Sequence, residues 1–140
     1  MGRGASSWMV WAGIALILLT GLVHLVEAPA YFTKAAYVGI LFLLNGAGAA
    51  LTALGVYRGG KDIGWGLGLL IAASSLAAYV VSRTIGLPGL EVEPWGDPAG
   101  VVSLIAEGLF VLLAIRALTL PDVPLPHGLV RRGEEQTVTE

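Results

Sequence analysis

The chain has 140 residues, of which eight are Lys or Arg and ten are Asp or Glu, so charged residues make up only 13%. Hydrophobic residues make up 56%, and the mean hydropathy is +0.80. Soluble domains carry about 25% charged residues, so the composition excludes an ordinary soluble protein. The absence of cysteine excludes disulfides and thiolate metal sites. A net charge of −2 without any run of basic residues excludes a nucleic-acid binder.

Four apolar stretches follow one another along the chain, and each is close to the roughly 20 residues that a helix needs to cross a bilayer. The first ends at Pro29, which lacks a backbone donor, and Asp97 before Pro98 is typical of the start of a helix. Strings such as IALILL are apolar at every position, which rules out the alternation of a β-barrel strand. We therefore predict an all-α integral membrane bundle of four transmembrane helices in contact with lipid, with spans at about 8–28, 36–57, 63–85 and 99–120.

The distribution of basic residues predicts the orientation, because cytoplasmic loops carry an excess of Lys and Arg. With a cytoplasmic N-terminus, only Lys34 and Arg83 fall outside, and six basic residues fall inside: Arg3, Arg58, Lys61, Arg116, Arg131 and Arg132. Residues 121–140 contain three prolines and mixed charges, which indicates a flexible cytoplasmic tail. We predict a multi-pass protein of the cell membrane with both termini cytoplasmic.

The segment Ala28-Pro29-Ala30 also resembles a signal-peptide cleavage site. The preceding apolar run is about 20 residues long, whereas the apolar region of a signal peptide has about 7–15 residues. The length favours a retained first span, and cleavage at Ala30 stays an alternative.

Glycines at four-residue spacing form one face of the third span: Gly60, Gly64 and Gly68. Small residues allow the close backbone approach on which helix packing in lipid depends. The face predicts either a homo-oligomer seam or, as the favoured interpretation, packing within a single bundle.

Few polar residues enter the predicted spans, and an ionisable group there costs about 2.5–3.5 kcal/mol on insertion scales. Each is a candidate functional residue for that reason. Neighbouring first and fourth spans would bring His24 close to Glu107. We predict an outward-facing polar pocket that binds an ion, a metal or a small ligand, formed by His24, Glu27, Asn45, Arg83 and Glu107.

The connection between the third and fourth spans is acidic and rich in proline. Such a stiff loop could cover the pocket or hold a cation through carboxylate oxygens. A solvated loop anchored by a tryptophan is the alternative. The residues of the predicted lid are Glu91, Glu93, Trp95 and Asp97.

Three interpretations remain open for His24, Glu27 and Glu107. One histidine and two carboxylates suit Fe(II) or Mn(II) as metal ligands. The same groups suit a proton or ion path in an oligomeric transporter. They could also form a structural hydrogen-bond network without a ligand. The residues predict no particular cofactor, although a single proximal histidine leaves haem open.

The strings GLVHLVEAPAYF, SRTIGLPG and SLIAEGLF resemble small four-span bacterial integral membrane proteins without an assigned activity, over most of residues 20–117. The resemblance implies the same four-span fold and transfers no role to any residue. No catalytic motif occurs, so we expect a binding protein rather than an enzyme, acting alone or as an accessory subunit of a larger membrane complex. The alternatives are a proton- or ion-coupled transporter and a structural or assembly protein.

Overall fold

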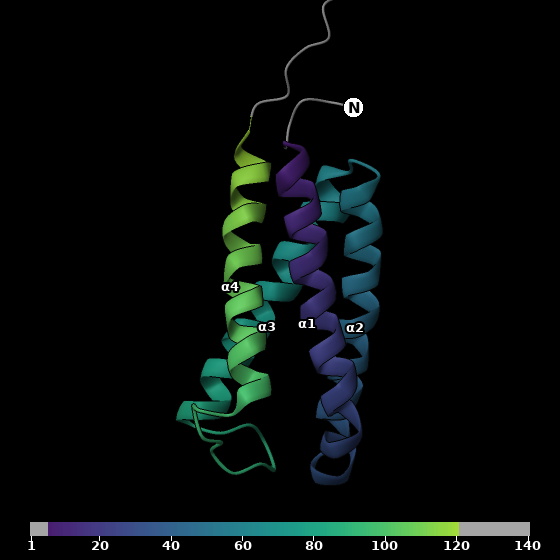
Figure 1. Cartoon of the computed structure of the whole chain (residues 1–140). Coiled ribbons are helices and arrows are strands. Elements are labelled where there is room, and N and C mark those ends of the chain that lie inside the picture. The colour runs from purple at the N-terminus through teal and green to yellow at the C-terminus, as the bar shows by residue number, and fades with distance from the viewer. Residues whose placement is uncertain (1–5, 121–140) are drawn as a thin grey trace, which may run out of the picture.

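A computed structural model describes residues 6–120, and the predicted cytoplasmic tail at 121–140 lies outside them. Within this range the chain forms four long helices and no strand (Figure 1). The predicted all-α bundle of four helices is therefore confirmed. Its elements are α1 (Ser7–Lys34), α2 (Ala36–Tyr57), the short π-helix η1 (Lys61–Gly66), α3 (Leu67–Thr84) and α4 (Pro98–Thr119).

The helices are arranged so that α1 packs against both α2 and α4, while α3 packs against α4 and, together with η1, against α2. The start of α1, η1 and the end of α4 lie at one end of the bundle, which we call the π-helix end (Figure 1). The α1–α2 turn and residues 85–97 lie at the opposite end, which we call the loop end.

All four helices are long and apolar enough to cross a membrane, with η1 and α3 counted together as one 24-residue segment. Each helix also exposes large apolar side chains on its outer face: examples are Leu22, Leu44, Leu70 and Leu112. A bundle that is apolar on its outside as well as in its core is suited to lipid rather than water.

The helix ends agree with the predicted spans except in α1. The Asp97 carboxylate accepts a hydrogen bond of 2.8 Å from the Gly100 N–H, and Pro98 occupies the first turn, which confirms the predicted start of α4. Helix α1, by contrast, continues through Pro29 to Lys34, so the predicted end at Pro29 is wrong. Proline removes one backbone hydrogen bond, and neighbouring helices make that loss tolerable within a membrane bundle.

Because α1 continues to Lys34, its end reaches the loop end of the bundle. A helix of 28 residues is about 42 Å long, which exceeds the roughly 30 Å of a hydrocarbon core. Its last turns carry Tyr31 and Lys34 to the connecting loop, where both contact Glu93.

Glycines allow α2 and the third span to touch at the π-helix end. A Cβ atom on Gly64 would lie 2.7 Å from the Val56 backbone nitrogen, and one on Gly55 would lie 2.7 Å from the Gly64 nitrogen. At Gly68 a Cβ atom would lie 2.5 Å from both Thr52 and Phe110. Gly64 and Gly68 of the predicted glycine face are thus buried inside the bundle, as the favoured interpretation expects, whereas Gly60 is half-buried.

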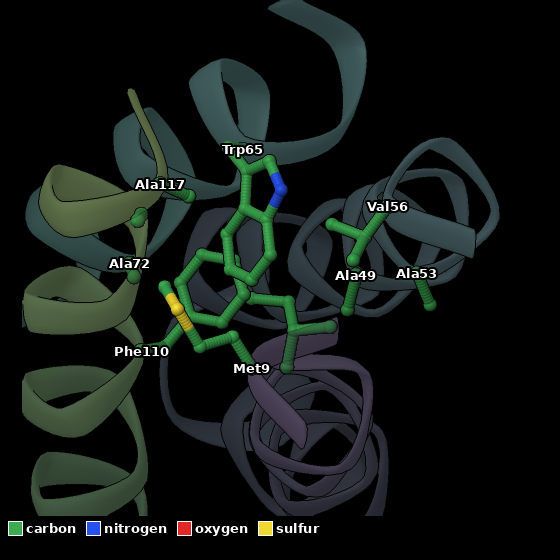
Figure 2. Packing of buried hydrophobic residues seen from close by; sticks show 10 residues of the cluster. Met9, Ala49, Ala53, Val56, Trp65, Ala72, Phe110 and Ala117 are labelled. Atoms are coloured by element: carbon green, nitrogen blue, oxygen red, sulfur yellow. The ribbon is translucent and has the colours of Figure 1, made fainter. Parts of the chain in front are cut away.

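Two aromatic rings fill the centre of the π-helix half of the bundle. Trp65 from η1 stacks on Phe110 from α4, with ring centroids 5.8 Å apart and an interplanar angle of 23°. Figure 2 shows Met9 beside these rings, with Val56 and Ala49 on the α2 side. Gly13 makes room for the indole, because a Cβ atom there would lie 2.6 Å from Trp65. This apolar cluster closes the bundle on the π-helix side.

We predict that Phe110→Ala lowers the free energy of unfolding by about 3–5 kcal/mol, because it opens a cavity beside Trp65. The measurement is reversible unfolding in mixed micelles with increasing dodecyl sulfate. Leu112→Ala, two residues along the same helix and 65% exposed, serves as the control and should change stability by less than about 0.5 kcal/mol. Equal losses in both variants would contradict the packing described for Phe110.

Candidate ligand-binding cavity

A cavity of about 90 Å³ lies towards the loop end, between the four helices and the α3–α4 connection. A single buried water needs about 10–15 Å³ of such space, so the cavity has room for several waters or a small organic molecule. Its lining is mixed. Val38, Phe42 and Ala78 supply apolar surface, and the polar side chains are His24, Glu27, Tyr31, Ser75, Tyr79, Ser82, Arg83, Glu93, Asp97, Ser103 and Glu107.

The deepest charged group of the cavity is Glu107 on α4, which is only 1% exposed. The Ser103 hydroxyl, one turn earlier on the same helix, donates a hydrogen bond of 2.9 Å to Glu107 Oε1. His24 Nε2 on α1 lies 3.9 Å from the same oxygen. The packing of α1 against α4 therefore places His24 and Glu107 next to each other, as their positions in the sequence predict.

Two contacts orient the His24 ring. Nδ1 lies 2.9 Å from the Thr20 carbonyl oxygen, and Nε2 lies 3.2 Å from the Ser75 hydroxyl of α3. Because a carbonyl oxygen can only accept, Nδ1 must carry the hydrogen. Phe42 meets the ring edge-on at 4.7 Å between centroids. In the neutral ring Nε2 is therefore an acceptor that points towards Ser75 and Glu107.

An ion-pair network holds the α3–α4 connection over the mouth of the cavity. Arg83, whose side chain is 5% exposed, forms a short ion pair with Glu93 and lies 4.0 Å from Asp97. The Tyr31 hydroxyl donates to Glu93 at 2.5 Å, and Lys34 lies 4.0 Å from the same carboxylate. The end of α1 is thereby tied to the loop through Glu93.

Further contacts fix the loop and Arg83 in place. The Glu93 N–H donates to the Ser82 carbonyl at 3.0 Å, and the Tyr37 hydroxyl donates to the Pro88 carbonyl at 2.7 Å. The Arg83 guanidinium lies 4.2 Å from the centroid of the Tyr79 ring. The loop is therefore anchored to α2 and α3 as well as to α1.

Four of the five residues predicted for the pocket line the cavity: His24, Glu27, Arg83 and Glu107. Two of the four residues predicted for the lid also line it, Glu93 and Asp97. The remaining three do not line it. Asn45 lies one turn beyond Phe42 towards the π-helix end, with Oδ1 buried and without a hydrogen-bond partner. Glu91 points to the exterior, and Trp95 is 52% exposed and packs edge-on against Tyr79.

The predicted metal site does not assemble in the described part of the chain. Residues 6–120 contain no group of three or more His, Asp or Glu side chains placed to hold a metal ion. Glu27 lies one turn nearer the mouth than His24, because a rise of about 1.5 Å per residue separates residues three apart by about 4.5 Å. His24, Glu27 and Glu107 therefore line the same cavity at different depths.

Sequence reasoning missed several polar members of the lining, above all Ser75, Ser103 and Tyr31. Ser103 could have been recognised, because it precedes Glu107 by four residues and side chains at that spacing meet on a helix. Nothing in the sequence indicates that Ser75 faces His24, since this contact depends on how α3 is rotated.

Four helices that are long and apolar enough to cross a membrane are compatible with a small membrane protein. No protein-family model, curated protein or solved structure matches the chain. The site must therefore be interpreted from its own geometry.

We predict that Arg83→Gln destabilises the protein by about 1.5–3 kcal/mol, the range for hydrogen bonds to charged groups, because Glu93 loses its buried partner. Unfolding in mixed micelles measures the loss. Lys34→Gln removes a cation from the same carboxylate at an exposed position and should cost less than about 1 kcal/mol. If the Lys34 variant were the less stable of the two, the assignment of Arg83 as the main partner of Glu93 would be wrong.

Proposed function

We propose that this chain is a multi-pass membrane protein that binds a small cation in the cavity at the loop end of the bundle. The observation that carries the proposal is the buried Glu107 carboxylate, which lines a cavity of about 90 Å³ and is accompanied there by hydroxyls and an imidazole.

The charges of the lining favour a cation over an anion. Four carboxylates line the cavity, against one guanidinium. That guanidinium, Arg83, lies against two of the four, Glu93 and Asp97. Glu107 at the deep end and Glu27 nearer the mouth are not among the carboxylates that it contacts. Because a charge away from water is costly unless it is paired, a cation between Glu27 and Glu107 would offset their charge.

The other end of the bundle supports binding at one face rather than a continuous pore. The stacked rings of Trp65 and Phe110, together with Met9 and Ile17, fill the π-helix half with apolar side chains. Apolar side chains offer an ion no groups to replace its water, and the buried Thr52 hydroxyl beside Phe110 is a single polar group among them. A transport function would require this cluster to separate, so we favour a binding role, alone or within a larger complex.

We propose that the loop end, and with it the cavity, faces away from the cytoplasm. Among the described residues, Arg58, Lys61 and Arg116 lie at the π-helix end, whereas the basic residues of the loop end, Lys34 and Arg83, both lie against the Glu93 carboxylate. An excess of basic residues on one side favours a cytoplasmic location for that side.

This orientation can be tested by labelling, because the chain has no native cysteine. Glu91→Cys and Asp62→Cys each replace an exposed acidic residue, one at each end of the bundle. In intact bacterial cells a membrane-impermeant maleimide should label only the Glu91→Cys protein, and both should react after the cells are opened. Labelling of Asp62→Cys alone in intact cells would reverse the proposed orientation.

Cation binding can be tested by thermal stability of the purified protein in detergent. We expect one or more chloride salts from a panel of alkali, alkaline-earth and ammonium cations to raise the unfolding temperature, since a ligand at about 100 times its Kd stabilises by about 2.7 kcal/mol. Glu107→Gln should remove the cation-specific shift, and Asp62→Asn, a matched change at the π-helix end, should keep it. The absence of a specific shift for every cation in the wild type would refute the proposal.

A further inference from the structure

We propose that the ligand of the cavity is a protonated alkyl amine, and that its binding releases a proton held between His24 and Glu107. The inference rests on the proposed function and goes further, because it names the chemical class of the cation and a coupled ion. Its basis is the arrangement of hydrogen-bond donors and acceptors at the deep end of the cavity.

The deep end places a buried carboxylate and an imidazole nitrogen next to each other without a fixed cation. The hydrogen on His24 Nδ1 is committed to the Thr20 carbonyl, so Nε2 of the neutral ring is an acceptor. Glu107 Oε1, 3.9 Å away, is an acceptor too when the carboxylate is ionised. Ser103 donates its hydrogen to Glu107, and the Ser75 hydroxyl beside Nε2 has a single hydrogen to donate. Each of the two acceptors thus has a hydroxyl beside it, but no Lys or Arg nitrogen of residues 6–120 lies within ion-pair distance of Glu107.

One additional proton on this pair supplies the missing positive charge. On His24 it turns Nε2 into a donor towards Ser75 and Glu107, and on Glu107 it turns the carboxyl into a donor towards His24. Both placements also avoid an ionised carboxylate without a cation in a bundle surrounded by lipid, which is the costly state. In the absence of a ligand, the pair therefore holds one proton.

An alkylammonium group can replace that proton. Its three N–H donors match the three acceptors that meet at the deep end, namely Glu107 Oε1, His24 Nε2 and Ser75 Oγ. Its positive charge pairs with the ionised carboxylate, so R–NH₃⁺ enters as H⁺ leaves and the charge inside the bundle is unchanged. A metal ion fits less well, because residues 6–120 provide no group of three His, Asp or Glu ligands.

The remaining lining fits the alkyl part of such a ligand. Val38, Phe42 and Ala78 form an apolar wall beside the polar end. With about 10–15 Å³ needed for each water-sized group, a cavity of about 90 Å³ has room for roughly six to nine of them. A butylammonium ion, with its four carbons and one nitrogen, fits within this space.

Other titratable groups face the pair without taking part in the exchange. Tyr31, Glu93 and Asp97 are engaged with Arg83 or with one another at the mouth, and Tyr79 packs beneath the Arg83 guanidinium. Glu27 on α1 lines the cavity one turn nearer the mouth. It adds to the attraction for a cation, so Glu27→Gln should weaken binding and leave the number of released protons unchanged.

The experiment is calorimetric titration of the wild-type protein in detergent micelles with n-butylammonium chloride, in two buffers of different ionisation enthalpy and at several pH values. We expect the release of close to one proton per bound amine. Below the pH range in which the pair is deprotonated, the Kd should rise about tenfold for each unit by which the pH falls. Tetramethylammonium, which has no N–H donor, should bind much more weakly. These measurements need no variant, so they stay decisive even if Glu107→Gln fails to fold.

The possible results separate the two proposals. One result would overturn the exchange and leave cation binding intact. In that result, butylammonium binds without proton release and with the same Kd between about pH 6 and pH 8, the range in which histidine titrates. Equal binding of tetramethylammonium, or binding of an inorganic cation alone, would overturn the assignment to an amine. Binding of no cation at all would overturn both proposals. In Glu107→Gln, if it folds, both binding and proton release should be lost, whereas Asp62→Asn should behave as the wild type.

Discussion

The backbone contact between Gly55 and Gly64 sets the shape of the whole bundle. Neither residue has a side chain, so α2 and the third span touch at the π-helix end, and the irregular turn of η1 directs Trp65 inward against Phe110. In lipid, where apolar side chains gain little by leaving the solvent, such close contacts supply much of the packing energy. At the loop end the helices are separated by larger polar side chains, and the cavity lies there.

The polar groups of the loop end stabilise an arrangement that apolar packing alone would not specify. Glu93 receives contacts from Arg83, Tyr31 and Lys34, and so joins a loop to two helices. This network uses the part of α1 that extends beyond Pro29. Had the helix ended at that proline, neither Tyr31 nor Lys34 would reach the loop, and the mouth of the cavity would lack one wall.

The sequence predicted the features that depend on a single helix. Hydropathy located the spans, and the Asp97-Pro98 pair located the start of α4, because both are local properties. The closeness of His24 and Glu107 followed from their places in the same half of the spans once α1 and α4 were taken as neighbours. The contact of Ser75 with His24, the displacement of Asn45 from the cavity and the π-helical turn depend on the rotation and spacing of whole helices, which no local pattern specifies.

The division of the bundle into a closed apolar half and an open polar half bears on what the protein can do. A group bound beside Glu107 can exchange with water through the mouth near Glu93, whereas the Trp65 and Phe110 rings block the opposite direction. In the proposed exchange, a proton that leaves the His24 and Glu107 pair would therefore take the route through which the ligand enters. Exchange at one face would change the occupancy of the site without moving net charge across the bundle, which is why a binding role is proposed rather than that of a channel.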